Sequence, residues 1–368
     1  MNTHHHAHLW PGVPLALGAA ALFGAAAPFS KLLMGAVDAW LLAGVLYLGA
    51  GIGLLVVLAG RGLFGLKAEA PLGRADVPWL GLVIMFGGCL GPVFLMLGLA
   101  QTTASAASLL LNVEGLATMA IAWAVFRENV DRRLMLGALC ILAGAVVLTW
   151  RGSGGTGEAE AFGPGAGLVL MACLCWGIDN NLTRKIAGAD PVQIAMIKGL
   201  VAGSVNVGLA LWQGARVPAA GVLVAGGTLG FAAVGLSLVM FILALRHLGT
   251  ARTGAYFALA PFIGALLAVG VLGETVTIAL LAAGALMAVG LWLHLAERHD
   301  HDHAHEAMAH AHMHVHDAHH QHGHDGPVTE PHSHWHEHAP LRHAHVHYPD
   351  LHHRHGHHRH GHDRHGHD

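Results

Sequence analysis

Ten stretches of about twenty mostly apolar residues follow one another along the chain, with short polar connections between them. A bilayer core about 30 Å thick is crossed by about 20 apolar helical residues. Each stretch therefore predicts one membrane-spanning helix, and we expect an all-α integral membrane protein in contact with the lipid bilayer. The predicted spans lie near 13–33, 39–59, 77–100, 102–126, 133–150, 165–187, 192–213, 219–245, 250–272 and 275–296.

The two ends of the chain are polar. The leader at 1–12 carries no Lys or Arg that could form the basic region of a signal peptide, so we interpret the first apolar stretch as an uncleaved helix. Residues 297–368 carry 28 of the 34 His and few large aliphatic side chains. A segment of that composition cannot bury a core, and we expect a disordered tail.

The apolar part of the chain is a repeat of two similar halves. A shift of 146 residues places Glu128 on Glu274, a rare match because acids are scarce in these stretches. A shift of 153 residues places Lys31 on Arg184. We therefore expect two five-helix copies, at 13–150 and 165–296, joined by an external loop at 151–164. An odd number of spans in each copy inverts the second copy relative to the first.

The distribution of Lys and Arg predicts the orientation, because cytoplasmic loops carry the excess of positive charge. One face carries Arg61, Lys67, Arg74, Arg127, Arg132, Arg133, Arg184, Lys185, Arg246 and Arg298, whereas the opposite face carries Arg151, Arg216 and Lys31. With an even number of spans, both termini and the His-rich tail are expected in the cytoplasm. The predicted location is a bacterial inner membrane.

An acid opens the last helix of each copy and is followed by spaced glycines. The first copy has Glu128 with Gly137 and Gly144, and the second has Glu274 with Gly284 and Gly290. In these features 13–296 resembles the EamA-type family of the drug/metabolite transporter superfamily. The resemblance implies ten helices in two inverted copies, cytoplasmic termini and transport of a small solute.

The family tends to place a proline midway along the fourth helix of each copy. Pro261 matches this feature in the second copy, but the first copy has Gly115 preceded by Glu114. Pro28, Pro92, Gly115 and Pro261 are all expected to interrupt helices. Since irregular backbone at membrane depth is tolerated inside protein or beside water, we expect the first, third, fourth and ninth helices to surround the pathway.

Ionisable groups inside spans are functional candidates because each costs at least about 2.5 kcal/mol at the bilayer centre. Glu114 lies near the middle of its span, close to Asn112, and is the main candidate for proton coupling or substrate contact. The alternative is a structural acid that is hydrogen-bonded to another helix.

A second polar group follows in the sixth and seventh spans. Asp179, Asn180 and Asn181 are consecutive, so they point about 100° apart and cannot all face one cavity. We expect Asp179 at the substrate site, although interhelical hydrogen bonding is the competing interpretation. Lys198 either neutralises Asp179 or Glu114 or extends to the nearer interface.

The tail alternates His with other residues, and neutral imidazole is a good ligand for Zn²⁺, Ni²⁺ and Cu²⁺. We expect several interchangeable metal sites there; the alternative is a low-complexity expansion with incidental affinity. The candidate ligands are His299, His301, His303, His305, His310, His312, His314, His316, His332, His334, His336 and His338.

Charge and motifs restrict the function class. Net charge is -3 with His neutral, and no basic surface for nucleic acid is evident. No phosphate-binding loop or nucleophile motif occurs, so we expect a secondary transporter and no enzyme. No cofactor is expected in the apolar body, and a homodimer is left open.

Two alternatives to a solute transporter remain. The first is a transition-metal transporter whose tail delivers or gates the ion. The second is a membrane-anchored metal-storage or sensing protein.

Overall fold

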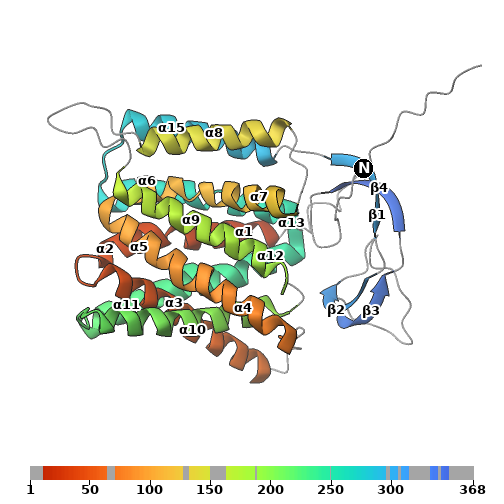
Figure 1. Cartoon of the computed structure of the whole chain (residues 1–368), viewed down its shortest axis with the longest axis horizontal. Coiled ribbons are helices and arrows are strands. Elements are labelled where there is room, and N and C mark those ends of the chain that lie inside the picture. The colour runs from red at the N-terminus through yellow and green to blue at the C-terminus, as the bar shows by residue number, and fades with distance from the viewer. Residues whose placement is uncertain are drawn as a thin grey trace, which may run out of the picture.

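The computed structural model consists of a bundle of membrane-length helices, with four short strands after it (Figure 1). Within the described residues, ten helical spans are long and apolar enough to cross a membrane, as the sequence predicts. The described residues are 11–63, 71–126, 132–149, 163–186, 189–248, 250–295, 299–305, 308–314, 332–338 and 341–347.

Several of the spans consist of more than one helix. The first copy comprises α1 (Gly12–Gly24) with α2 (Ala26–Leu33); α3 (Ala39–Leu63); the 3-10 helix η1 (Arg74–Asp76) with α4 (Val77–Val83), the π-helix η2 (Ile84–Leu90) and α5 (Gly91–Gln101); α6 (Ala104–Leu110) with α7 (Val113–Phe126); and α8 (Arg132–Thr149). The second copy comprises α9 (Pro164–Thr183); α10 (Pro191–Trp212); α11 (Ala220–Gly230) with the π-helix η3 (Phe231–Leu236) and α12 (Ser237–Leu248); α13 (Thr250–Phe257) with α14 (Ala260–Leu272); and α15 (Ile278–Leu295).

The helix boundaries repeat with the same offset as the sequence. Helices α8 and α15 begin at Arg132 and Ile278 and end at Thr149 and Leu295, 146 positions apart at both ends. The breaks α6/α7 and α13/α14 lie 147 positions apart, and the π-helices η2 and η3 begin 147 and end 146 positions apart. The two copies therefore share irregular backbone as well as helix order, which is stronger support for duplication than apolar matches.

Contacts between the segments that connect successive spans show that the chain crosses the membrane back and forth. The Arg61 guanidinium, at the end of the second span, lies 3.8 Å from Asp190, just before the seventh. Glu274, between the ninth and tenth spans, accepts a hydrogen bond from the backbone N–H of Ala104 at the start of the fourth. Connections after even spans thus meet on one face and connections after odd spans meet on the other, as two inverted halves require.

The spaced glycines of the last helices bring the two copies together. Helices α8 and α15 lie side by side along one edge of the bundle (Figure 1). A Cβ placed on Gly137 would lie 2.9 Å from the carbonyl oxygen of Gly290, and one on Gly290 would lie 2.6 Å from that of Gly137. Small residues allow this close backbone approach. Close packing stabilises helix association in lipid, where no hydrophobic effect drives the helices together.

Residues of the tail form two antiparallel pairs of strands. Strand β1 (His299–His305) pairs with β4 (Leu341–His347), and β2 (Met308–His314) pairs with β3 (His332–His338). The sequence predicts a disordered tail, and these four short strands were not predicted. Alternating composition has the two-residue period of an extended strand. Isolated two-stranded pairs are marginally stable at best because they have no core.

Candidate functional site

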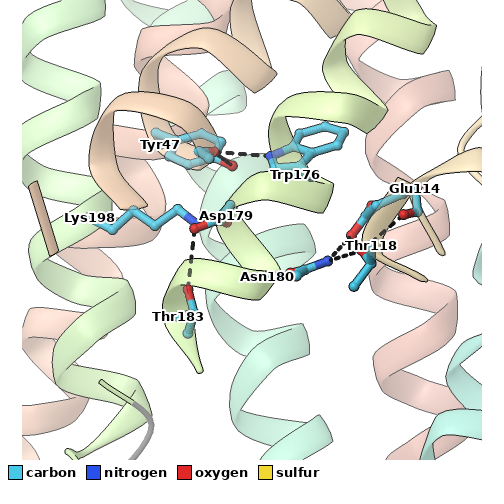
Figure 2. Close-up of polar contacts among 9 residues, drawn as sticks. Tyr47, Glu114, Thr118, Trp176, Asp179, Asn180, Thr183 and Lys198 are labelled. Atoms are coloured by element: carbon cyan, nitrogen blue, oxygen red, sulfur yellow. Dashed lines mark hydrogen bonds and ion pairs between the residues drawn. The ribbon is translucent and has the colours of Figure 1, made fainter. Parts of the chain in front are cut away.

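Helix α9 directs two consecutive polar side chains toward two different helices. Asp179 faces α10, where it meets Lys198, whereas Asn180 faces α7, where it meets Glu114 (Figure 2). The roughly 100° between successive helical side chains produces this divergence. One turn of α9 therefore connects the two ionisable groups that the sequence identifies separately.

The Lys198 ammonium donates a hydrogen bond to Asp179 Oδ2 and forms an ion pair with it. The Lys198 and Asp179 side chains are 17% and 6% exposed. The hydroxyl of Thr183, one turn along α9, donates a hydrogen bond to Asp179 Oδ1 at 3.3 Å. Both carboxylate oxygens are therefore engaged, and of the sequence alternatives for Lys198, the pairing with Asp179 is the one observed.

Glu114 is held by amide and hydroxyl groups. Asn180 Nδ2 donates to Glu114 Oε1 at 3.0 Å and lies 3.2 Å from Thr118 Oγ1, while the Thr118 hydroxyl donates to the Glu114 carbonyl at 3.0 Å. Asn181 Nδ2 donates to the backbone carbonyl of Thr118 at 3.0 Å. Because Asp179 and Asn180 are consecutive on α9, the Asp179–Lys198 pair and the Glu114 contacts meet at one turn of that helix.

A π-helix lies against this site. In η2 the carbonyl of Gly87 accepts hydrogen bonds from Tyr47 Oη and from Trp176 Nε1, both at 3.0 Å. Asn206 Nδ2 donates to the carbonyl of Cys89 at 3.2 Å. A π-turn shifts the helical hydrogen-bond pattern, and such turns occur frequently at functional sites. Here, side chains of α3, α9 and α10 satisfy carbonyls in the middle of the third span.

Gly87 is also the point at which η2 approaches Asp179. A Cβ on Gly87 would overlap the Asp179 carboxyl group, so a glycine is needed there for the ion pair to fit. The Asp179–Lys198 pair, the π-helix and the two aromatic donors are consequently packed as one unit.

The structure unites most of the predicted site residues and separates one. Glu114, Asp179, Asn180, Asn181 and Lys198 lie together, as described above. Asn112 does not join them: its Nδ2 donates to the Leu109 carbonyl at 2.8 Å and lies 3.9 Å from Met287 Sδ on α15. Asn112 sits in the break between α6 and α7, which turns its side chain toward the other edge of the bundle.

Helix interruptions occur at all four predicted positions. Pro28 and Gly115 follow the α1/α2 and α6/α7 breaks. Pro92 is the second residue of α5, after η2, and Pro261 is the second residue of α14, after the α13/α14 break. That these breaks line the pathway stays a prediction. The eighth span is also irregular, at η3, although no proline marks it.

Four contributors to the site were not predicted from the sequence. Tyr47 and Trp176 resemble ordinary apolar core residues in their spans, and Thr118 and Thr183 are common helical residues. The Gly87-xxx-Gly91 spacing was the available signal for the π-helix, but 50 glycines make such spacings frequent by chance.

The predicted metal ligands lie outside the side chains that the structure describes. This applies to His299, His301, His303, His305, His310, His312, His314, His316, His332, His334, His336 and His338, and likewise to Glu128 of the repeated acid motif. Among the described side chains, no group of three or more His, Cys, Asp or Glu is arranged to hold a metal ion.

Ten membrane-length helical spans in two inverted halves, with a polar site between α7, α9 and α10, are the architecture of a multi-pass membrane transporter of a small molecule. The sequence profile of the EamA-like transporter family matches residues 10–150 and 163–296. The chain belongs to the EamA-like transporter family, within the drug/metabolite transporter superfamily.

Two individual proteins are similar to this chain, one in sequence and one in fold. The chain is 30% identical over 230 residues to an uncharacterized transporter of Methanothermobacter thermautotrophicus, covering 62% of this chain and 67% of that protein. A protein of known crystal structure has a similar fold, with a TM-score of 0.56 and 21% identity, covering 77% of this chain and 95% of the other.

Proposed function

We propose that the protein is a secondary transporter of a small polar organic solute and works by alternating access of its two inverted halves. Glu114 and the Asp179–Lys198 pair form the substrate and coupling site. The observation that supports this proposal is the position of α9, whose Asp179 and Asn180 contact charged residues on two other helices. A substrate that engages either side of α9 thereby affects both groups.

The chemistry of the site favours an organic solute over a divalent metal ion. The Asp179 carboxylate is already neutralised by the Lys198 ammonium, which repels a cation. A solute that carries both a donor and an acceptor group can replace the two halves of the pair. Glu114, held through the neutral amide of Asn180, then exchanges a proton during the cycle and couples transport to a gradient.

We further propose a bacterial inner-membrane location with cytoplasmic termini, from the excess of Lys and Arg on one face. The tail then lies in the cytoplasm and binds Zn²⁺, Ni²⁺ or Cu²⁺ to buffer or sense the metal. At three or four ligands per ion, 28 His accommodate roughly seven to nine ions.

The second candidate function is transport of the metal ion itself, with the tail delivering or gating it. The density of His in the tail is the observation that favours this candidate. A metal-storage or sensing protein with a passive anchor is the weakest candidate, because anchoring requires one helix and no inverted repeat.

Comparing metabolite and metal contents in cells with and without the protein tests these candidates. The organic-solute proposal expects one class of metabolite to change its distribution, with metal content dependent only on the tail. Flux of radioactive Zn²⁺ or Ni²⁺ in proteoliposomes is the decisive second measurement. Metal flux that persists without the tail and saturates with concentration would establish the metal-transport candidate and refute the organic-solute proposal.

A further inference from the structure

The connection between the third and fourth spans is held from both sides by charged residues of distant segments. Helix α5 ends at Gln101, Thr102 and Thr103 are extended, and α6 begins at Ala104. A two-residue connection leaves the last carbonyls of one helix and the first N–H groups of the next without intrahelical partners. Lys31 and Glu274 provide these partners.

Glu274 binds the start of α6. Its Oε1 accepts from the N–H of Ala104 at 2.6 Å and its Oε2 accepts from the N–H of Ser105 at 2.9 Å. The next N–H, of Ala106, donates to Thr103 Oγ1 at 3.3 Å. A carboxylate at this position is also favoured by the partial positive charge of a helix N-terminus. Glu274 belongs to the second copy, whereas α6 belongs to the first, so this cap joins the two halves.

Lys31 binds the end of α5. Its ammonium donates to the carbonyl of Leu99 and, at 2.8 Å, to the carbonyl of Thr102. It also interacts electrostatically with Glu274. The segment 99–105 is thus enclosed between a cation from the first span and an anion from the connection between the ninth and tenth spans. All three segments meet on the face opposite the start of α1 and the end of α15.

We propose that Lys31 and Glu274 form a latch that closes this face of the transporter and must open in each transport cycle. In alternating access, the two halves separate on one face while they meet on the other. Moving α6 away from the second half breaks both Glu274 hydrogen bonds and leaves two N–H groups exposed. The latch therefore sets the population of the state that is open on this face. Lys31 and Glu274 are positioning residues, which act on helix movement and need no contact with the solute.

This inference rests on the chain being a transporter, and it is independent of the roles proposed for Glu114, Asp179 and Lys198. The test uses a reporter beneath the latch: Ser108 of α6, which is 1% exposed. The full-length chain carrying Ser108→Cys is placed in nanodiscs, where both faces are accessible, and reacted with a hydrophilic maleimide. Mass spectrometry follows labelling at residue 108 separately from the native cysteines, without added substrate.

The labelling rate at residue 108 reports the open population. Glu274→Gln keeps one acceptor oxygen, whereas Glu274→Ala keeps none. We expect the labelling rate at residue 108 to increase about five-fold for Glu274→Gln and by more for Glu274→Ala. Increases of this size correspond to the loss of a helix cap. Lys31→Gln should raise the rate in the same direction. The matched control is Asp76→Asn, because Asp76 Oδ2 likewise accepts a backbone hydrogen bond, from Gly73 at 2.8 Å, but on the opposite face.

A second reporter separates opening of the latch from loosening of the whole protein. Ser237 of α12 is 2% exposed and lies outside the latch. Labelling of Ser237→Cys should not change in the Glu274 variants. An equal increase at both reporters, or no increase at residue 108 in folded Glu274→Gln and Lys31→Gln, would overturn the proposal. Glu274→Gln and Lys31→Gln are included only when their circular dichroism matches that of the wild type, so the test does not depend on the folding of Glu274→Ala.

Discussion

The Asp179 carboxylate and the Lys198 ammonium form an ion pair between α9 and α10, with one carboxylate oxygen bound by Lys198 and the other by Thr183. Sequence separation between the two charges is 19 residues, and each lies in its own membrane span. A single unpaired charge at that depth is costly, so the two charges stabilise each other.

Replacing one member of this pair should destabilise the protein more than replacing both. Asp179→Asn or Lys198→Met alone leaves one buried charge unpaired, at a cost of about 3–5 kcal/mol, whereas the double variant should recover most of that loss. Thermal unfolding in detergent measures the effect. The control is Arg61→Gln at the Arg61–Asp190 contact, which is longer, at 3.8 Å, and where we expect a smaller loss. Single variants as stable as the wild type would refute the buried-pair interpretation.

Replacing Gly87 should disturb the same pair through packing. Gly87→Ala places a methyl group on the Asp179 carboxyl, and overpacking of this kind typically costs about 1–3 kcal/mol. Gly81→Ala in the same span is the matched control, because a Cβ there meets nothing within 4 Å. Thermal unfolding of the two variants should therefore differ. Equal melting temperatures would show that η2 adjusts without cost.

Glu114→Gln tests proton coupling. The variant keeps the shape of the side chain and removes its charge, so it should fold and insert normally but lose gradient-driven transport. The measurement is flux of the solute identified by metabolite comparison, with and without an imposed pH gradient. Asp76→Asn, a carboxylate far from the site, should leave the flux unchanged. Full pH-dependent transport by Glu114→Gln would assign Glu114 a structural role.

Removal of the tail should separate metal binding from transport. A chain ending after Arg298 should insert and melt in detergent like the full chain when metal is absent, because the tail has no core-forming apolar residues. It should lose most of its Zn²⁺ and Ni²⁺ binding, measured by calorimetry. Binding to the full chain should weaken below about pH 6, since protons compete for imidazoles with an unperturbed pKa near 6.5. Unfolding of the shortened chain would show that the body does not end near residue 296.

Orientation can be tested by labelling single cysteines from outside intact cells. Val130→Cys and Asp300→Cys should remain unlabelled because both positions are predicted to be cytoplasmic. Ser153→Cys, in the predicted external loop, should react with a membrane-impermeant maleimide. Labelling at residue 130 would reverse the orientation inferred from the Lys and Arg distribution.

Much of the fold was predictable from the sequence because membrane insertion is governed by local properties. Apolar length determined the ten spans, and the 146-residue offset between Glu128 and Glu274 revealed the repeat. The same offset separates the observed boundaries of α8 and α15. Prolines and Gly115 also marked four of the interrupted helices.

The tertiary structure alone decided which polar groups meet. Sequence order places Asn112 two residues from Glu114, yet the break after α6 directs it toward Met287 instead. Lys198 could have extended to the interface, and its partner was settled by the packing of η2 against both α9 and α10, at Gly87 and Gly88. The pairing of Glu274 with α6, 170 residues away, depends on the inverted second half meeting the first. Hydrophobic length is encoded within each segment, whereas hydrogen bonds between segments depend on the distances that helix packing creates.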